Sequence, residues 1–243
     1  MFAVTGCRRS GTSLWMQILA AGGVPIVGER FSRDWEEALA DANPEGFWES
    51  DHRDGVAPDV SPDLLAGKAV KVFVHGLVTT DVAHLEKAIA TLRPWREHVA
   101  SVTRFEAIEE AARGEAVPRA LPAPLEWWYE TYCLLGDVAE RGYPLMLAAY
   151  DTVLEAPRET IERAFGFLEV EGDLGAAVAA VRPELRTQRG ETEVETDLDP
   201  EIVAVFDELY DRVRERRGFD GDFLERMNAT QEALEPLIAP HLA

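Results

Sequence analysis

Phe2-Ala-Val-Thr-Gly-Cys-Arg-Arg-Ser-Gly-Thr-Ser-Leu-Trp-Met16 is the stretch of sequence that decides the fold. Its first four residues are apolar or β-branched, which predicts a buried parallel strand as far as Thr5. A turn bounded by Gly6 and Gly11 follows, and apolar residues then recur at helical spacing. A strand, a glycine turn and a helix N-terminus direct backbone N–H groups and a helix dipole at one point. The stretch therefore predicts an anion-binding cradle.

The turn resembles the nucleotide-binding P-loop, but it lacks the lysine expected after the second glycine. Its cations are Arg8 and Arg9, and an arginine inside the loop can contact two oxygens of a phosphate or sulfate group. The residues from Ser10 to Ser13 would supply backbone N–H and hydroxyl donors, although Thr12 or Ser13 would also serve as an ordinary helix N-cap. The missing lysine and the lack of a clear acidic Mg²⁺ partner argue against ATP-driven phosphoryl transfer.

Strand and helix patterns alternate along the chain, which has 243 residues, 47% of them hydrophobic. The alternation predicts one α/β domain over residues 1–243, with three α/β/α layers and a central parallel sheet of about four to five strands. Beyond the first strand, we expect strands at 24–27, 69–75, 97–104 and 144–150. We expect helices at 31–42, 81–92, 106–113, 125–141, 157–168, 174–181 and 200–217, and a C-terminal helical extension at 219–243.

The chain is strongly acidic, with a formal net charge of −21. A phosphate backbone needs a basic partner surface, so the charge argues against nucleic acid and permits a neutral or cationic small molecule as the acceptor. A generally acidic surface that keeps the protein soluble is the alternative explanation, and we favour it. Two cysteines do not make a disulfide framework, and five scattered histidines without a ligand pattern predict no metal site. Neither a secretory signal nor an apolar run of membrane-spanning length is visible, which predicts a cytoplasmic protein without a membrane partner.

Three blocks of the sequence resemble the sulfotransferases, in the same order. Gly6-Cys-Arg-Arg-Ser-Gly-Thr-Ser13 resembles the family signature Gly-x-Pro-Arg-Ser-Gly-Thr-Ser, with arginine in place of the usual proline. Asn43-Pro-Glu-Gly-Phe-Trp-Glu49 resembles a block of bacterial members, and the residues from Leu147 to Leu168 resemble their late strand and helix. The resemblance implies transfer of a sulfuryl group from 3′-phosphoadenosine 5′-phosphosulfate to a hydroxyl or amine of a small acceptor, without a metal.

The resemblance also implies roles for arginines around the donor. Arg9 matches the loop cation that stabilises negative charge on the leaving phosphate. Arg8 either adds to the field at the donor or turns outward into solvent. Arg186 and Arg189 resemble a late basic loop that closes over the donor, with surface charges on a loop as the alternative.

The donor's 3′-phosphate needs cations from another part of the chain. Arg104 would close the strand expected at 97–104 and matches the arginine that the family places at such a strand end. The family adds a serine eight positions later, but this position is Ala112, and the neighbouring Arg113 is the candidate to compensate. The glutamates between Glu106 and Glu110 are unusual neighbours for a phosphate.

Glu49 and His75 are the candidates for the general base that accepts the acceptor's proton. Burial of Glu49 beside Phe47 and Trp48 would raise its pKa, as a base needs. His75 would end the strand expected at 69–75, as a histidine ends a strand in cytosolic sulfotransferases, although the spacing here is longer by two. A histidine at a strand end is also a common structural residue, and we favour Glu49.

The helix expected at 125–141 carries four aromatic residues: Trp127, Trp128, Tyr129 and Tyr132. Their spacing places most of them in the core, with one or two left to line an acceptor pocket. Two other functions stay open. One is a P-loop kinase-like nucleotide-binding enzyme that takes Mg-ATP, and the other is a catalytically silent relative that binds a nucleotide or a partner protein.

Overall fold

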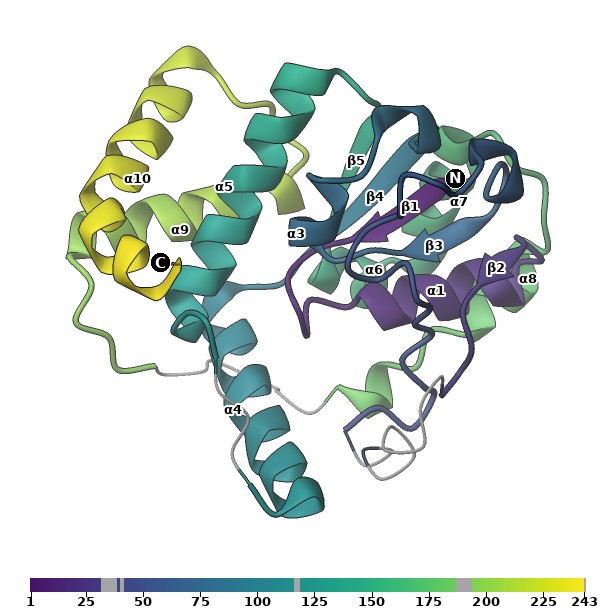
Figure 1. Ribbon diagram of the computed structural model, residues 1–243, viewed down its shortest axis with the longest axis horizontal. Coiled ribbons are helices and arrows are strands. Elements are labelled where there is room, and N and C mark those ends of the chain that lie inside the picture. Colours follow the sequence, from purple (N-terminus) through teal and green to yellow (C-terminus); the bar gives the residue numbers. More distant parts are fainter. Residues whose placement is uncertain (32–38, 40–41, 116–118, 187–193, 243) are drawn as a thin grey trace.

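Five parallel strands form the central sheet of the computed structural model, in the order β2-β3-β1-β4-β5 (Figure 1). The structure describes residues 1–31, 39, 42–115, 119–186 and 194–242. The strands are β1 (Phe2–Thr5), β2 (Ile26–Val27), β3 (Ala69–Lys71), β4 (Lys87–Leu92) and β5 (Leu145–Ala149). β1 is buried along its whole length because it pairs with β3 on one side and with β4 on the other.

Helices cover both faces of the sheet, which confirms the three-layer α/β/α fold (Figure 1). One face packs against α1 (Thr12–Ala21), α6 (Tyr150–Glu155), α7 (Pro157–Leu168) and α8 (Leu174–Ala179). The other face packs against α3 (Val74–Leu77) and α5 (Ala123–Arg141). Successive side chains of β1 point to opposite faces, so Val4 joins the first core and Ala3 the second.

A third core lies on the side of α5 that faces away from the sheet. It joins α5 to α4 (Trp95–Arg113), α9 (Pro200–Arg214) and α10 (Gly221–Leu242). Trp128 of α5 stacks on Phe206 of α9 with their ring centroids 4.9 Å apart, and Trp127 packs on the same ring. Figure 1 shows α10 beside α5 and α9, so the predicted C-terminal extension is a packed helix. No helix in the described part of the chain is long and apolar enough to cross a membrane.

The sheet order places a crevice beside β1. From β1 the chain passes through α1 to β2 and β3 on one side, and it then crosses to β4 and β5 on the other. The segments that leave the carboxyl ends of β1 and β4 therefore diverge, which is the position where open α/β sheets bind ligands.

Two predicted elements between residues 81 and 104 are wrong. The helix expected at 81–92 is a short 3₁₀ turn, Val82–His84, followed by strand β4, and the strand expected at 97–104 lies inside helix α4. β4 is buried on nearly all of its residues, so its apolar side chains do not alternate and can imitate helical spacing. The strand expected at 69–75 ends at Lys71, and the helix expected at 31–42 lies mostly outside the described residues.

Candidate functional site

The cradle forms as the sequence predicts, between β1 and α1. Gly6 and Gly11 have φ angles of 136° and 114°, and a Cβ on Gly6 would lie 2.5 Å from the Thr91 carbonyl oxygen. Gly11 is the N-cap of α1 and no side chain caps the helix, so the capping role considered for Thr12 or Ser13 is wrong. The first turn also carries no acidic residue. Its amides and the positive end of its dipole are available to an anion.

Arg9 lies in the cradle with an uncommon left-handed backbone, φ 65°. Its Nη2 donates to the Ala42 carbonyl oxygen at 2.9 Å, its Nε donates to Ser101 Oγ at 3.5 Å, and the guanidinium lies over Phe105. Among the described residues, no carboxylate lies within ion-pair distance of it. Burial, together with the positive charges of Arg93 and Arg104, lowers its pKa to about 10. The cradle thus holds a partly desolvated cation that an anion would stabilise.

A cavity of about 170 Å³ opens in front of the cradle. Its basic lining residues are Arg8, Arg9, Lys71, Arg93, Arg182 and Arg186. The carboxylates that line it are Glu45 and Glu49. An excess of cations at one cavity of a chain with net charge −21 indicates an anionic ligand.

The predicted position of Arg104 is wrong. It lies on an exposed face of α4 instead of at a strand end, and it does not line this cavity. The arginine that follows β4 is Arg93, which is buried, lines the cavity and donates to the Arg9 carbonyl oxygen at 3.4 Å. Eight positions after Arg93 is Ser101, also buried and in contact with Arg9. Arg93 and Ser101 therefore have the strand-end position and the eight-residue spacing that the sequence analysis considered for Arg104 and Ala112.

Of the other three arginines predicted to bind the co-substrate, one lines the cradle cavity, one lies away from it, and one lies outside the described residues. Arg113 pairs with Glu109 at 2.8 Å on α4, away from the cradle cavity. Arg186 lines the cavity and pairs with Glu97 and with Asp151. Arg189 lies outside the described residues.

Within the loop, the residues differ in their access to the cavity. Gly11, Thr12 and Ser13 line it, whereas Ser10 is buried and uses its amide to bond the Cys7 carbonyl oxygen. Arg8 also lines the cavity and pairs with the buried Glu126, with 3.4 Å between Nε and Oε1.

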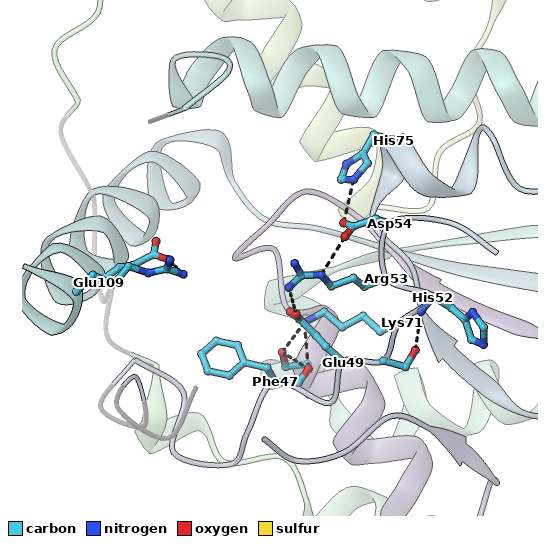
Figure 2. A network of polar contacts seen from close by, with 11 residues as sticks. Phe47, Glu49, His52, Arg53, Asp54, Lys71, His75 and Glu109 are labelled. Carbon is cyan, nitrogen blue, oxygen red and sulfur yellow. Dashed lines mark hydrogen bonds and ion pairs between the residues drawn. The ribbon is translucent and has the colours of Figure 1, made fainter. Parts of the chain in front are cut away.

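Glu49 lies in a chain of ionic contacts that crosses the site (Figure 2). Lys71 at the end of β3 lies 2.9 Å from Glu49 Oε1, and Arg53 lies 2.8 Å from Oε2. Burial alone would raise the pKa of Glu49, but the Lys71 ammonium and the hydrogen bond from Arg53 outweigh it and hold that pKa below its ordinary value. The expectation of a raised pKa is therefore wrong, because Trp48 and Phe47 are not the groups that decide it.

His75 lies at the other end of this chain of contacts. It lies in α3, after the strand has ended, so the prediction of a strand-end position is wrong. Its Nε2 is 3.2 Å from Asp54 Oδ1, and Asp54 also pairs with Arg53 (Figure 2). A histidine held by a carboxylate is an arrangement that can serve as a general base.

A second cavity, of about 760 Å³, adjoins the first. Glu49, Phe47 and Phe105 line both cavities, and His75 lines only the second. Glu109 approaches this second cavity from α4 and lies across from the His75 side in Figure 2. Its volume is in the range of small-molecule sites, so the two cavities can hold an anionic and an organic ligand side by side.

No model of a known protein family matches the chain. A search of curated proteins finds no match either. A function for this chain therefore depends on the chemistry of the cradle and of the two cavities.

Proposed function

We propose that the protein is a sulfotransferase that uses 3′-phosphoadenosine 5′-phosphosulfate as co-substrate and a small organic molecule as acceptor. The observation that carries this proposal is the pairing of an uncapped helix N-terminus with Arg9, a cation that has no carboxylate partner among the described residues. The adjoining second cavity supports a second, organic substrate. The chain as a whole is acidic, so the excess of basic residues at this one cavity supports an anionic ligand there.

The residues of the cradle fit the co-substrate's two anionic ends. The amides of Thr12 and Ser13 would hold the 5′-phosphate, and Arg93, which also lines the cavity, would hold the 3′-phosphate. Arg9 lines the same cavity, contacts Ser101 and Arg93, and would stabilise the negative charge that develops on the leaving phosphate. When bound, the co-substrate supplies the sulfuryl group.

Glu49 is our first candidate for the base because it lines both cavities. Its lowered pKa keeps it ionised at neutral pH, but the same pairing with Lys71 and Arg53 makes it a weaker base. His75 with Asp54 is the second candidate, on the acceptor side. We place the enzyme in the cytoplasm on the grounds given by the sequence.

Thermal unfolding with adenosine 3′,5′-bisphosphate tests the proposal. We expect this nucleotide to stabilise the protein without Mg²⁺, by about 2.7 kcal/mol at a concentration one hundred times its dissociation constant. AMP, which lacks the second phosphate, should stabilise it less. Stabilisation by Mg-ATP alone would contradict the proposal and favour a kinase-like enzyme. Binding of the bisphosphate without transfer to any acceptor would favour a catalytically silent relative.

A further inference from the structure

The second cavity has an apolar wall, and the half-buried carboxyl side chain of Glu130 belongs to its lining. Phe47, Phe73, Phe105, Leu121 and Tyr129 provide the apolar wall. Glu130 of α5 provides the carboxyl, and its Oε2 atom is buried without a hydrogen-bond partner among the described residues. A buried polar atom without a hydrogen-bond partner is costly, and here it belongs to a side chain that also lines the cavity.

The other carboxylates of this cavity are matched by cations. Glu126 forms ion pairs with two arginines, at 2.7 Å from Arg119 and 3.4 Å from Arg8. Glu109 pairs with Arg113 at 2.8 Å. Glu49 and Asp54 share Arg53. Glu130 is the carboxyl of this cavity that has no ion pair with a described residue.

The surroundings of Glu130 favour its neutral form in the free protein. Burial and the negative charge of Glu126, one helical turn earlier, raise the pKa of Glu130 to about 8. The Cys7 thiol lies within hydrogen-bonding reach, and Arg8 opposes the shift only in part. Cys133 lies one turn away on α5, Glu109 and Arg113 line the cavity from α4, and His75 lines it from α3. None of these groups supplies a cation next to Glu130 Oε2.

We propose that the second cavity binds an organic cation, an ammonium group on an apolar body, with Glu130 as its counter-ion. The apolar wall takes the body of the ligand, and the unpaired carboxyl takes its charge. The net charge of −21 attracts such a cation towards the protein. The identity of the ligand rests on the proposed function: if that function holds, the ligand is the acceptor. Its ammonium then lies beside Glu130, and its nucleophile lies toward Glu49.

Three matched probes test the binding site without any need for catalysis. They are 2-phenylethylamine, 2-phenylethanol and phenylacetate, which share one apolar body and carry a positive, a neutral and a negative head group. We expect calorimetry to find the amine bound at least ten times more tightly than the alcohol at pH 8, and phenylacetate bound most weakly. Equal affinity of amine and alcohol would overturn the proposal and indicate a neutral hydroxyl ligand that accepts a hydrogen bond from protonated Glu130.

The pH dependence adds a readout that a merely structural role would not give. Binding of the cation needs the ionised carboxylate, so affinity for the amine should rise as pH rises from 6 to 8, by up to roughly 50-fold for a carboxyl that titrates near 8. The probe stays charged over this range because an alkylammonium titrates near 10. Affinity for 2-phenylethanol should not rise.

The variant Glu130→Gln keeps the shape of the side chain and removes its charge. It should lose both the preference for the amine and the rise with pH, whereas Glu109→Gln, whose carboxylate is already paired, should keep the rise. If Glu130→Gln keeps the preference, the proposal is wrong. Should this variant fail to fold, the comparison of the three probes on the wild-type protein still decides.

Adenosine 3′,5′-bisphosphate binding to the same proteins separates this proposal from the proposed function. If the amine binds at Glu130 and the bisphosphate does not bind, the cation site stands and the sulfotransferase fails. If the bisphosphate binds and the amine shows no preference, the cation site fails alone.

Discussion

Arg9 combines a left-handed backbone with a partly buried guanidinium that no described carboxylate neutralises. A backbone conformation of this kind costs of order 1–3 kcal/mol and persists only where the surroundings fix it. Here the surroundings are Ser101 and the Ala42 carbonyl oxygen, which hold the side chain beside the cradle. The residue is positioned before any ligand arrives, as a group that stabilises developing charge should be.

Replacement of Arg9 and Arg93 by alanine should therefore affect different steps. We expect Arg9→Ala to lower kcat by roughly 10²- to 10³-fold with a smaller effect on the binding of adenosine 3′,5′-bisphosphate. Arg93→Ala should weaken binding of the bisphosphate first. Arg104→Ala is the matched control on the exposed face of α4, and calorimetry should find its affinity within about twofold of the wild type. A larger loss for Arg104 than for Arg93 would contradict the assignment.

The base can be identified by two conservative replacements. Glu49→Gln keeps the size of the side chain and removes its basicity, and we expect a loss of activity of roughly 10²- to 10⁴-fold with donor affinity little changed. His75→Asn should lose much less. The reverse result in steady-state kinetics would make His75, with Asp54, the base.

His98 should make the protein sensitive to acid. It is fully buried on α4 with neither ring nitrogen hydrogen-bonded to a described residue, and burial together with the nearby arginines, Arg119 first, lowers its pKa to about 3. The unfolded chain takes up the proton near pH 6.5, so stability falls as pH falls below that value, by about 2 kcal/mol between pH 7 and pH 5 from this residue.

The free energy of unfolding of the variant His98→Leu should change less between pH 7 and pH 5 than that of the wild type. The leucine loses no hydrogen bond, and denaturant unfolding at pH 7 and pH 5 gives the comparison. An equally steep loss of stability in the variant would show that other groups cause the acid sensitivity.

At the scale of elements, the sequence predicts those helices and strands whose ends are marked by local sequence patterns. β1, the cradle, α1, α5 and α7 lie where the sequence analysis places them, because glycines, prolines and strong periodicity mark their ends. The stretch from 81 to 104 was misassigned because β4 has neighbours on both sides and is covered on both faces, so it needs no alternation. Val99, Val102 and Thr103 favour strands by propensity, but α4 packs against α5 and α9, and this tertiary packing outweighs the local preference.

Because residues 97–104 form a helix and not a strand, the candidate 3′-phosphate residue is Arg93 and not Arg104. Pro94 directly before the helix was the available signal, since proline favours the first positions of a helix and disfavours its interior. A helix that begins there makes Arg93 a strand-end residue and brings Ser101 to the cradle. The ion pair of Glu49 with Lys71 could not be predicted because the tertiary fold brings the two residues together, whereas Arg53, four residues after Glu49, is a local partner.

The cradle should tolerate no side chain at its first glycine. Gly6 has φ 136°, and an added Cβ would lie 2.5 Å from the Thr91 carbonyl oxygen and 2.7 Å from Ser10 Oγ. We expect Gly6→Ala to cost about 1–3 kcal/mol of stability and to abolish binding of adenosine 3′,5′-bisphosphate. Gly23→Ala is the control, since it also has a positive φ but meets no atom within 4 Å. Equal nucleotide affinity in both variants would show that the loop adapts.

At the scale of the whole molecule, α10 is part of the core. It buries Phe223, Met227, Leu234 and Ile238 in the cluster that contains Trp128. Removal of residues 221–243 should cost more than about 6 kcal/mol of apolar burial, which is comparable to the whole stability of an ordinary domain. We expect the truncated chain to lose its near-ultraviolet circular dichroism and its cooperative melting. A shortened protein that melts at the wild-type temperature would make α10 a dispensable addition.

The position of β1 in the sheet also has a consequence for how the protein is made. This strand precedes both of its partners in the sequence, and these partners are Ala69–Lys71 and Lys87–Leu92. A ribosome that adds residues in order must release the chain as far as β4 before the central strand has both neighbours. Pairing over such separations is slow, because a long loop must close before any contact stabilises it. The cradle is thus translated before the two strands that flank β1, and it takes shape only once β3 and β4 have emerged.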